Sequence, residues 1–170
     1  MVDFTRLIQL PHTAGCLVCG RDNPHGMQLD LHVDRETGAV HATFTPAAEH
    51  IGFEGIIHGG VLATVLDEAM VWAATWSGRR FCVCGELNVR FRRTAQVGVP
   101  IHVQASVEVS RGRLITTVGS LADAGGVVAE GSAKYVPLSA EKNREFLETL
   151  QQHPSTLEAV VYLREEVAVE

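Results

Sequence analysis

The sequence lacks the features that define several classes of protein. Its longest apolar run, Val61–Trp76, is short for a membrane span and contains two adjacent acids, Asp67 and Glu68. Basic charge is not in excess: 14 basic against 20 acidic residues give a net charge of −6, which disfavours general nucleic-acid binding. No basic leader precedes an apolar core at the start, so no signal peptide is predicted. We therefore expect a cytoplasmic protein with neither a membrane nor a nucleic acid as its partner.

Cysteine is scarce, and the spacing of the four cysteines is not that of a usual metal site. Cys16 and Cys19 form a C-x-x-C pair, but one residue alone separates Cys82 from Cys84, inside a predicted strand. Structural zinc sites usually combine two wider-spaced pairs. A redox C-x-x-C pair would need a thioredoxin-like strand–helix–strand context, which is missing. The sequence thus predicts reduced thiols and no metal ligands.

The chain is long and apolar enough for one domain with a sizeable core. Of its 170 residues, 46% are hydrophobic and 20% are charged, which is too apolar for a disordered protein. We divide the chain into a lead-in with a C-x-x-C-G loop over 1–26, a central domain over 27–137 and a helical tail over 138–170.

Hydrophobic periodicity predicts one long helix and six strands in the central domain. The helix covers Val61–Trp76, and two amphipathic helices are expected in the tail, at Glu141–Gln151 and Thr156–Val167. Strands are expected at 27–33, 39–45, 81–93, 102–110, 114–122 and 127–136. Because the long helix is apolar around most of its circumference, we expect a curved antiparallel sheet to surround it. This arrangement is the hotdog fold, an α+β architecture.

Three residues at the start of the long helix, His58, Gly59 and Gly60, form a candidate site for a developing negative charge. Backbone N–H groups of a first helical turn have no helical partners and lie at the positive end of the helix dipole. Glycines there let a substrate approach the backbone closely, as an oxyanion hole requires. The alternative is that the two glycines serve only close packing of the helix on the sheet.

Asp67 is the better candidate for a reacting carboxylate of the two acids in this helix. It shares a helical face with small residues, whereas Glu68 shares its face with larger ones. Small neighbours leave room for a substrate beside Asp67. The alternative is a structural aspartate paired with an arginine or with a helix cap. The residues that share the face of Asp67 are Gly60, Ala63, Thr64, Val71 and Ala74.

The separation of these candidates along the helix predicts a dimer. Eight residues from Gly59 to Asp67 span about 12 Å of helix. A reacting carbon must lie within about 3–3.5 Å of its attacking group and close to its oxyanion donors. Two antiparallel helices would bring Asp67 of one subunit to Gly59 of the other. If the groups act together, the site therefore requires a C2 homodimer, alone or within a dimer of dimers.

Positive charge is concentrated in one segment of this acidic chain. Between Arg79 and Arg113 there are seven arginines and two acids, which indicates an anionic ligand. Three polar side chains on one face of a predicted strand and a hairpin turn form the candidate patch for phosphate groups. The alternative is that exposed strands simply carry arginines. The patch consists of Asn88, Arg90, Arg92, Arg111, Gly112 and Arg113.

Three segments together resemble a known family. They are HGGVLATVLDEAM (58–70), GELNVRFRRTAQVG (85–98) and CLVCGRDNPHGM (16–27). The chain resembles a hotdog-fold acyl-CoA thioesterase of the phenylacetate-pathway type, over roughly residues 16–137. This resemblance implies hydrolysis of an acyl-CoA to a free acid and CoA.

The resemblance also implies roles for individual residues. Asp67 takes the position of the catalytic acid, as general base or nucleophile, and the N–H of Gly59, with that of Gly60, takes the oxyanion role. His58 orients the loop or contacts the thioester carbonyl. Arg90, Arg92 and the Gly112–Arg113 turn take positions that contact CoA.

The sequence departs from the family pattern at two positions. Gly52 stands where many relatives have asparagine, and Cys84 stands where many have serine or threonine. Two rival functions remain open on this evidence. One is a non-catalytic acyl-CoA-binding domain with a regulatory role, which would not need Asp67. The other is a hotdog dehydratase, which would need a catalytic histidine that the helix lacks.

Overall fold

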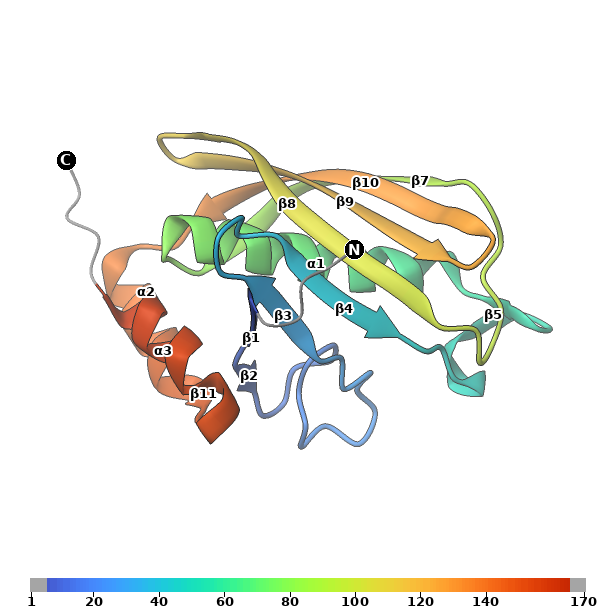
Figure 1. The fold of residues 1–170 in the computed structure, drawn as a ribbon, viewed down its shortest axis with the longest axis horizontal. Coiled ribbons are helices and arrows are strands. Elements are labelled where there is room, and N and C mark those ends of the chain that lie inside the picture. The colour runs from blue at the N-terminus through green and yellow to red at the C-terminus, as the bar shows by residue number, and fades with distance from the viewer. Residues whose placement is uncertain (1–5, 166–170) are drawn as a thin grey trace.

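The computed structural model describes residues 6–165, which form a seven-stranded antiparallel sheet with one long helix across its inner face (Figure 1). The strand order is β1-β3-β4-β8-β9-β10-β7. Short pairs β2 with β11 and β5 with β6 lie outside this sheet. The strands are β1 Leu7–Gln9, β2 His12–Thr13, β3 Leu31–Asp34, β4 Val40–Phe44, β5 Ile51–Phe53, β6 Ile56–Ile57, β7 Cys82–Phe91, β8 Ile101–Arg111, β9 Leu114–Asp123, β10 Gly126–Pro137 and β11 Leu150–Gln151. The helices are α1 Gly59–Gly78, α2 Ala140–Thr149 and α3 Leu157–Arg164.

Helix α1 packs on strands β4 and β7–β10 through its apolar side chains. Leu66, fully buried, lies over two glycines of the sheet, Gly119 in β9 and Gly131 in β10. A Cβ at either glycine would approach the Leu66 side chain to 3.0 and 2.8 Å, respectively. These two glycines therefore let the helix lie close to the sheet at its centre.

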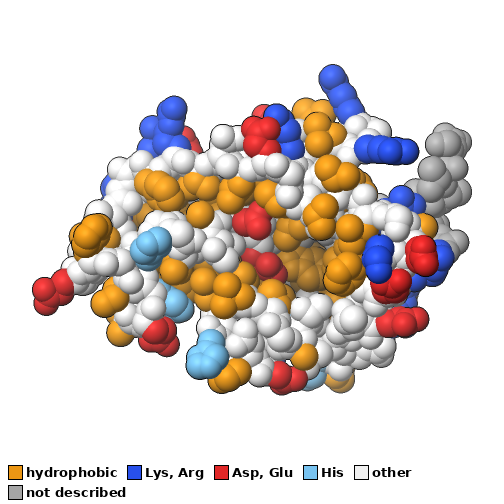
Figure 2. Space-filling view, turned by 180° about the vertical axis from the view of Figure 1, so that it is seen from behind, with side chains coloured by type: hydrophobic (Ala, Val, Ile, Leu, Met, Phe, Trp, Pro, Cys, Tyr) orange, Lys and Arg blue, Asp and Glu red, His pale blue; other side chains and the backbone are white. Residues whose placement is uncertain are grey.

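One face of α1 is left uncovered by residues 6–165, which differs from the prediction of burial nearly all round. Gly60 is exposed, and Ala63, Thr64, Asp67 and Val71 are half-buried. The small-residue face predicted around Asp67 is thus open from Gly60 to Val71, whereas Ala74, farther along the same face, is buried. Figure 2 shows this side of the molecule, where a hollow with acidic side chains is rimmed by hydrophobic ones.

Strand β7 forms one edge of the sheet and changes register halfway. It pairs with β10 alone within the sheet, and the pairing shifts between Lys134 and Tyr135, so that Gly85 is an extra residue in β7. Because the bulge reverses the alternation, Cys82 and Cys84 before it and Val89 after it all face α1. The other edge of β7 is unpaired among the described residues.

The lead-in and the tail both pack on the central domain. Strand β1 extends the main sheet beside β3, and α3 lies against β1. Tyr162 of α3 stacks on Trp76 near the end of α1, with ring centroids 3.9 Å apart. Residues 1–5 and 166–170 of the predicted lead-in and tail, including Val167 of the last predicted helix, lie outside the described residues. Within the described part, no helix combines the length and apolarity that a membrane span requires.

Candidate active site

The start of α1 is built around His58. Its backbone is extended, and its Nδ1 atom accepts the N–H of Gly60 at 2.8 Å, so His58 caps the helix. A Cβ at Gly60 would approach this Nδ1 atom to 2.9 Å, and one at Gly52 would approach the His58 ring to 3.0 Å. Glycine at both positions therefore leaves room for the His58 ring. The cap occupies the N–H of Gly60, one of the two predicted oxyanion donors.

Gly59 is the first residue of α1, and its N–H has no hydrogen-bond partner among residues 6–165. A Cβ at this position would meet the Phe91 ring of β7 at 3.3 Å. The helix start therefore lies against the end of the edge strand. Of the two predicted donors, Gly59 is the one that the fold leaves free for a ligand.

Asp67 is held by a residue that the sequence did not indicate. The O–H group of Tyr135 in β10 donates to Asp67 Oδ1 at 2.6 Å and contacts the Asp67 carbonyl oxygen at 3.1 Å. Tyr135 is fully buried, and its burial, followed by the bond to Asp67, raises the pKa of its hydroxyl. The tyrosine therefore stays protonated and fixes one carboxylate oxygen. The half-buried carboxylate lies on the open face of α1.

Cys84 also lies beside the Asp67 carboxylate. Burial, followed by the negative charge of Asp67, raises the pKa of the Cys84 thiol, which therefore stays protonated. The bulge at Gly85 turns this thiol toward α1. The position at which many relatives carry a hydroxyl thus holds a thiol beside the candidate catalytic acid.

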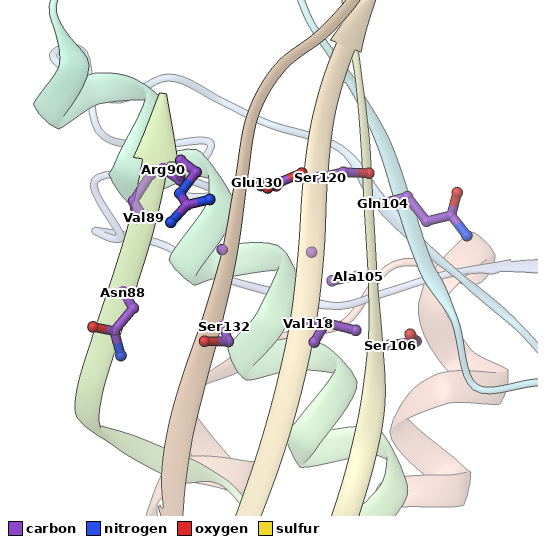
Figure 3. A pocket seen from close by; sticks show the side chains of 12 residues that line it. Asn88, Val89, Arg90, Gln104, Ala105, Ser106, Val118, Ser120, Glu130 and Ser132 are labelled. Carbon is purple, nitrogen blue, oxygen red and sulfur yellow. The ribbon is translucent and has the colours of Figure 1, made fainter. Parts of the chain in front are cut away.

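The predicted phosphate-binding residues do not form one patch within a chain. Asn88 and Arg90 line a groove of about 760 Å³ on the outer face of the sheet, opposite α1, together with Gln104, Ser120 and Glu130 (Figure 3). Arg92 forms an ion pair with Glu130, whereas Arg90 has no ion-pair partner among the residues that the structure describes.

Arg111 and Arg113 lie far from Arg90 along the sheet. They flank Gly112, whose φ of 56° is in the left-handed region and forms the β8–β9 turn. The register places Arg90 in the row of Ser120, and six residues of β9, about 20 Å, separate Ser120 from the start of that strand. The prediction that this turn lies beside Arg90 and Arg92 is therefore not met within one chain.

Residues 54–135 match the model of the thioesterase superfamily. This segment contains α1, Asp67 and Tyr135. Over this segment the chain resembles the thioesterase superfamily. The predicted α+β hotdog architecture and the resemblance to this superfamily are confirmed. This match points to a thioester hydrolase.

Several solved structures resemble this domain. One thioesterase superfamily protein is 27% identical to this chain, with a TM-score of 0.66. The match covers 72% of this chain and 60% of that protein. A phenylacetic acid degradation-related protein from Ralstonia eutropha JMP134 is 25% identical, with a TM-score of 0.60 over 65% of this chain and 85% of its own. A mutant of phenylacetic acid degradation protein PaaI from Thermus thermophilus, at 22% identity and a TM-score of 0.59, covers 65% of this chain and 93% of its own and shares the fold. No curated protein matches the chain.

Proposed function

We propose that this thioesterase domain hydrolyses acyl-CoA thioesters to a free acid and CoA. The observation that carries the proposal is the Asp67 carboxylate, which Tyr135 fixes at 2.6 Å on the open, small-residue face of α1. A carboxylate that is held in place and reachable from solvent suits an attack on a bound thioester. No metal or cofactor is required for this reaction.

In the proposed mechanism, Asp67 acts on the thioester carbon with water. As general base, it takes a proton from water, whose oxygen then forms a bond to the carbonyl carbon. As nucleophile, it would form that bond itself, and water would cleave the resulting anhydride. In either case the carbonyl oxygen becomes an oxyanion that the N–H of Gly59 stabilises. The C–S bond breaks, and the CoA sulfur leaves and takes up a proton.

The proposed site lies between two protomers. Asp67 and Gly59 are separated by about 12 Å along the continuous helix α1, too far to act on one carbon. The open face of α1 and the unpaired edge of β7 provide the surface for an antiparallel second copy. Val83, Leu87 and Phe91 expose 51%, 36% and 51% of their surface on β7, which favours a covering partner. Each homodimer then contains two sites, and a dimer of dimers would preserve them.

Arginines without acidic partners are the proposed contacts for the phosphates of CoA. Among the described residues, Arg90, Arg111 and Arg113 form no ion pair, whereas Glu130 neutralises Arg92. Guanidinium groups bind phosphate oxygens through paired hydrogen bonds. We expect the partner protomer's turn to complete the patch, because antiparallel pairing of two β7 strands brings opposite strand ends together.

Removal of a free arginine is expected to weaken CoA binding without slowing the chemical step. Arg113→Ala or Arg90→Ala should raise KM about tenfold or more with little change in kcat, since one charge-assisted hydrogen bond is lost far from the thioester. Arg92→Ala should raise KM less, because Glu130 already pairs with this arginine. The measurement is the KM ratio of variant to wild type for an acyl-CoA and for the matching acyl-N-acetylcysteamine.

The truncated ester supplies the control for this prediction. It carries no phosphate, so its KM should be the same for the variants and the wild type. Arg144→Ala, on the exposed side of α2, should leave both KM values unchanged. Equal KM ratios for the two substrates would show that the arginines support the fold rather than CoA binding.

A hydrolysis screen tests the proposed function directly. The wild-type protein is incubated with a panel of aliphatic and aromatic acyl-CoA esters, and the released CoA thiol is detected. We expect hydrolysis of at least one class of acyl-CoA ester to exceed its spontaneous rate. Saturable binding without thiol release would instead support an acyl-CoA-binding domain and overturn the enzymatic proposal.

A cytoplasmic location, which we also propose, would maintain the four free cysteines in reduced form.

A further inference from the structure

The neighbour of Asp67 in the sequence, Glu68, belongs to a different cluster. Its carboxylate and the thiols of Cys16 and Cys19 lie within 4.8 Å of one another. Cys19 is buried, and Cys16 and Glu68 are half-buried. The lead-in loop and α1 thus bring three acidic groups together, although at least 49 residues separate the cysteines from Glu68 in the sequence.

The loop around Cys16 is held in a fixed shape by its own backbone. The N–H groups of Val18 and Cys19 point at the Cys16 sulfur, at 3.3 and 3.5 Å, and the N–H of Gly20 donates to the Cys16 carbonyl oxygen at 3.1 Å. A Cβ at Gly20 would approach the backbone N and O atoms of Cys16 to 2.5 Å, so only glycine permits this turn. The N–H of Leu29 donates to Val18 at 2.8 Å and anchors the loop.

No basic side chain is paired with this cluster in the described chain. No lysine or arginine forms a salt bridge with Glu68 among residues 6–165. Two thiols and a carboxylate this close together offer sulfur and oxygen donors to a bound cation.

The donor set and its spacing suit a divalent cation of the zinc type. Zinc binds thiolates and carboxylates, and a zinc–sulfur bond of about 2.3 Å places tetrahedral ligand atoms about 3.8 Å apart. Small side-chain rotations bring atoms within 4.8 Å to that spacing. Trp72 Nε1 donates to Glu68 Oε1 at 3.1 Å, which orients the carboxylate from behind, as hydrogen-bond partners of metal ligands do.

We propose that Cys16, Cys19 and Glu68 form a binding site for one zinc-type cation that ties the lead-in loop to α1. This site is separate from the proposed hydrolytic reaction, and no step of that reaction passes through it. The sequence predicts no metal because Cys82 and Cys84 do not form a usual second cysteine pair, and the third ligand is a carboxylate far along the chain. Cys82 and Cys84 do not take part: Cys82 donates to the Arg80 carbonyl oxygen, and Cys84 lies beside Asp67. Three protein ligands leave a fourth position for water.

Metal content of the purified protein tests this proposal. After incubation with zinc sulfate and gel filtration, wild-type protein should retain about one zinc per chain by mass spectrometry of the elements. Cobalt(II) in place of zinc should give a thiolate-to-cobalt charge-transfer band. Cys16→Ser, Cys19→Ser and Glu68→Gln should each lose most of the metal, and Cys84→Ser should retain it. Zinc content near zero in the wild type, or full metal content in Glu68→Gln, would overturn the proposal.

A second measurement keeps the test decisive if a ligand variant does not fold. Removal of metal from the wild-type protein with a chelator should lower its melting temperature, and added zinc should restore it. An unchanged melting temperature in all three states would refute a metal that ties the loop to α1. A disulfide between Cys16 and Cys19 in the freshly purified protein would likewise refute it, because oxidised cysteines cannot bind the cation.

Discussion

Asp67→Asn should lower kcat for acyl-CoA hydrolysis by about 10²-fold or more, the usual size of a general-base contribution. The substitution is nearly isosteric, and the amide oxygen of the new side chain would still accept the Tyr135 hydroxyl. The fold should therefore be preserved, and KM should change little, because the carboxylate acts on the reacting carbon rather than on CoA. The measurement is kcat with the best substrate of the screen, together with a thermal melt.

The control for this variant is Glu108→Gln, which removes one exposed negative charge from β8, away from α1. Its kcat should equal that of the wild type. If Asp67→Asn kept its activity within about threefold of the wild type, well short of a general-base contribution, another group would have to act as the catalytic acid or base.

Two inactive variants should recover activity when they are mixed. Asp67→Asn lacks the carboxylate, and Gly59→Pro lacks the N–H donor. Proline is well tolerated at the first position of a helix, and the extended backbone of His58 before it, with φ −62° and ψ 131°, is the conformation that a following proline requires. Each heterodimer would hold one intact site. Random exchange of equal amounts should therefore restore about a quarter of wild-type activity.

The alternative arrangement makes the opposite prediction. If Asp67 and Gly59 of the same chain served one site, every site in the mixture would be defective and no activity would return. Gly59→Ala is the matched control, since it adds the same Cβ against Phe91 but retains the N–H, and it should be more active than Gly59→Pro. Verified subunit exchange without recovery, or a monomer in sedimentation, would argue against a shared site.

The sequence predicted elements whose pattern is local and missed contacts that depend on register. Periodicity located α1 and the four strands after it, and the small-residue face of Asp67 is the open face of the helix. The contact between Tyr135 and Asp67 joins residues 68 apart, and it depends on how α1 lies across β10, which no local pattern reveals. The alternating pattern predicts only that Tyr135 faces inward, and it does not predict which helix residue the tyrosine meets.

The remaining differences have the same physical origin. The large side chains on the helical face of Glu68 indicate no site there, yet the lead-in loop brings Cys16 and Cys19 to Glu68. Arg113 and Arg90 were expected to be neighbours because both lie in a meander of antiparallel strands. The lengths of β9 and β10 place them at opposite ends instead. Element type follows from short-range sequence, whereas distance between elements follows from strand length and register.

The order of strands has a consequence for how the domain forms during synthesis. Strand β7 follows α1 directly in the chain, but its neighbour in the sheet is β10, which emerges only after β8 and β9. Until β10 emerges, the backbone edge of β7 that pairs with it has no partner, and Asp67 has no tyrosine beside it. Such non-local pairing slows folding and leaves apolar surface exposed for longer. The corner around Asp67 therefore closes only after β10 has emerged, and a chain that stops before β10 has the acid but not the tyrosine that holds it.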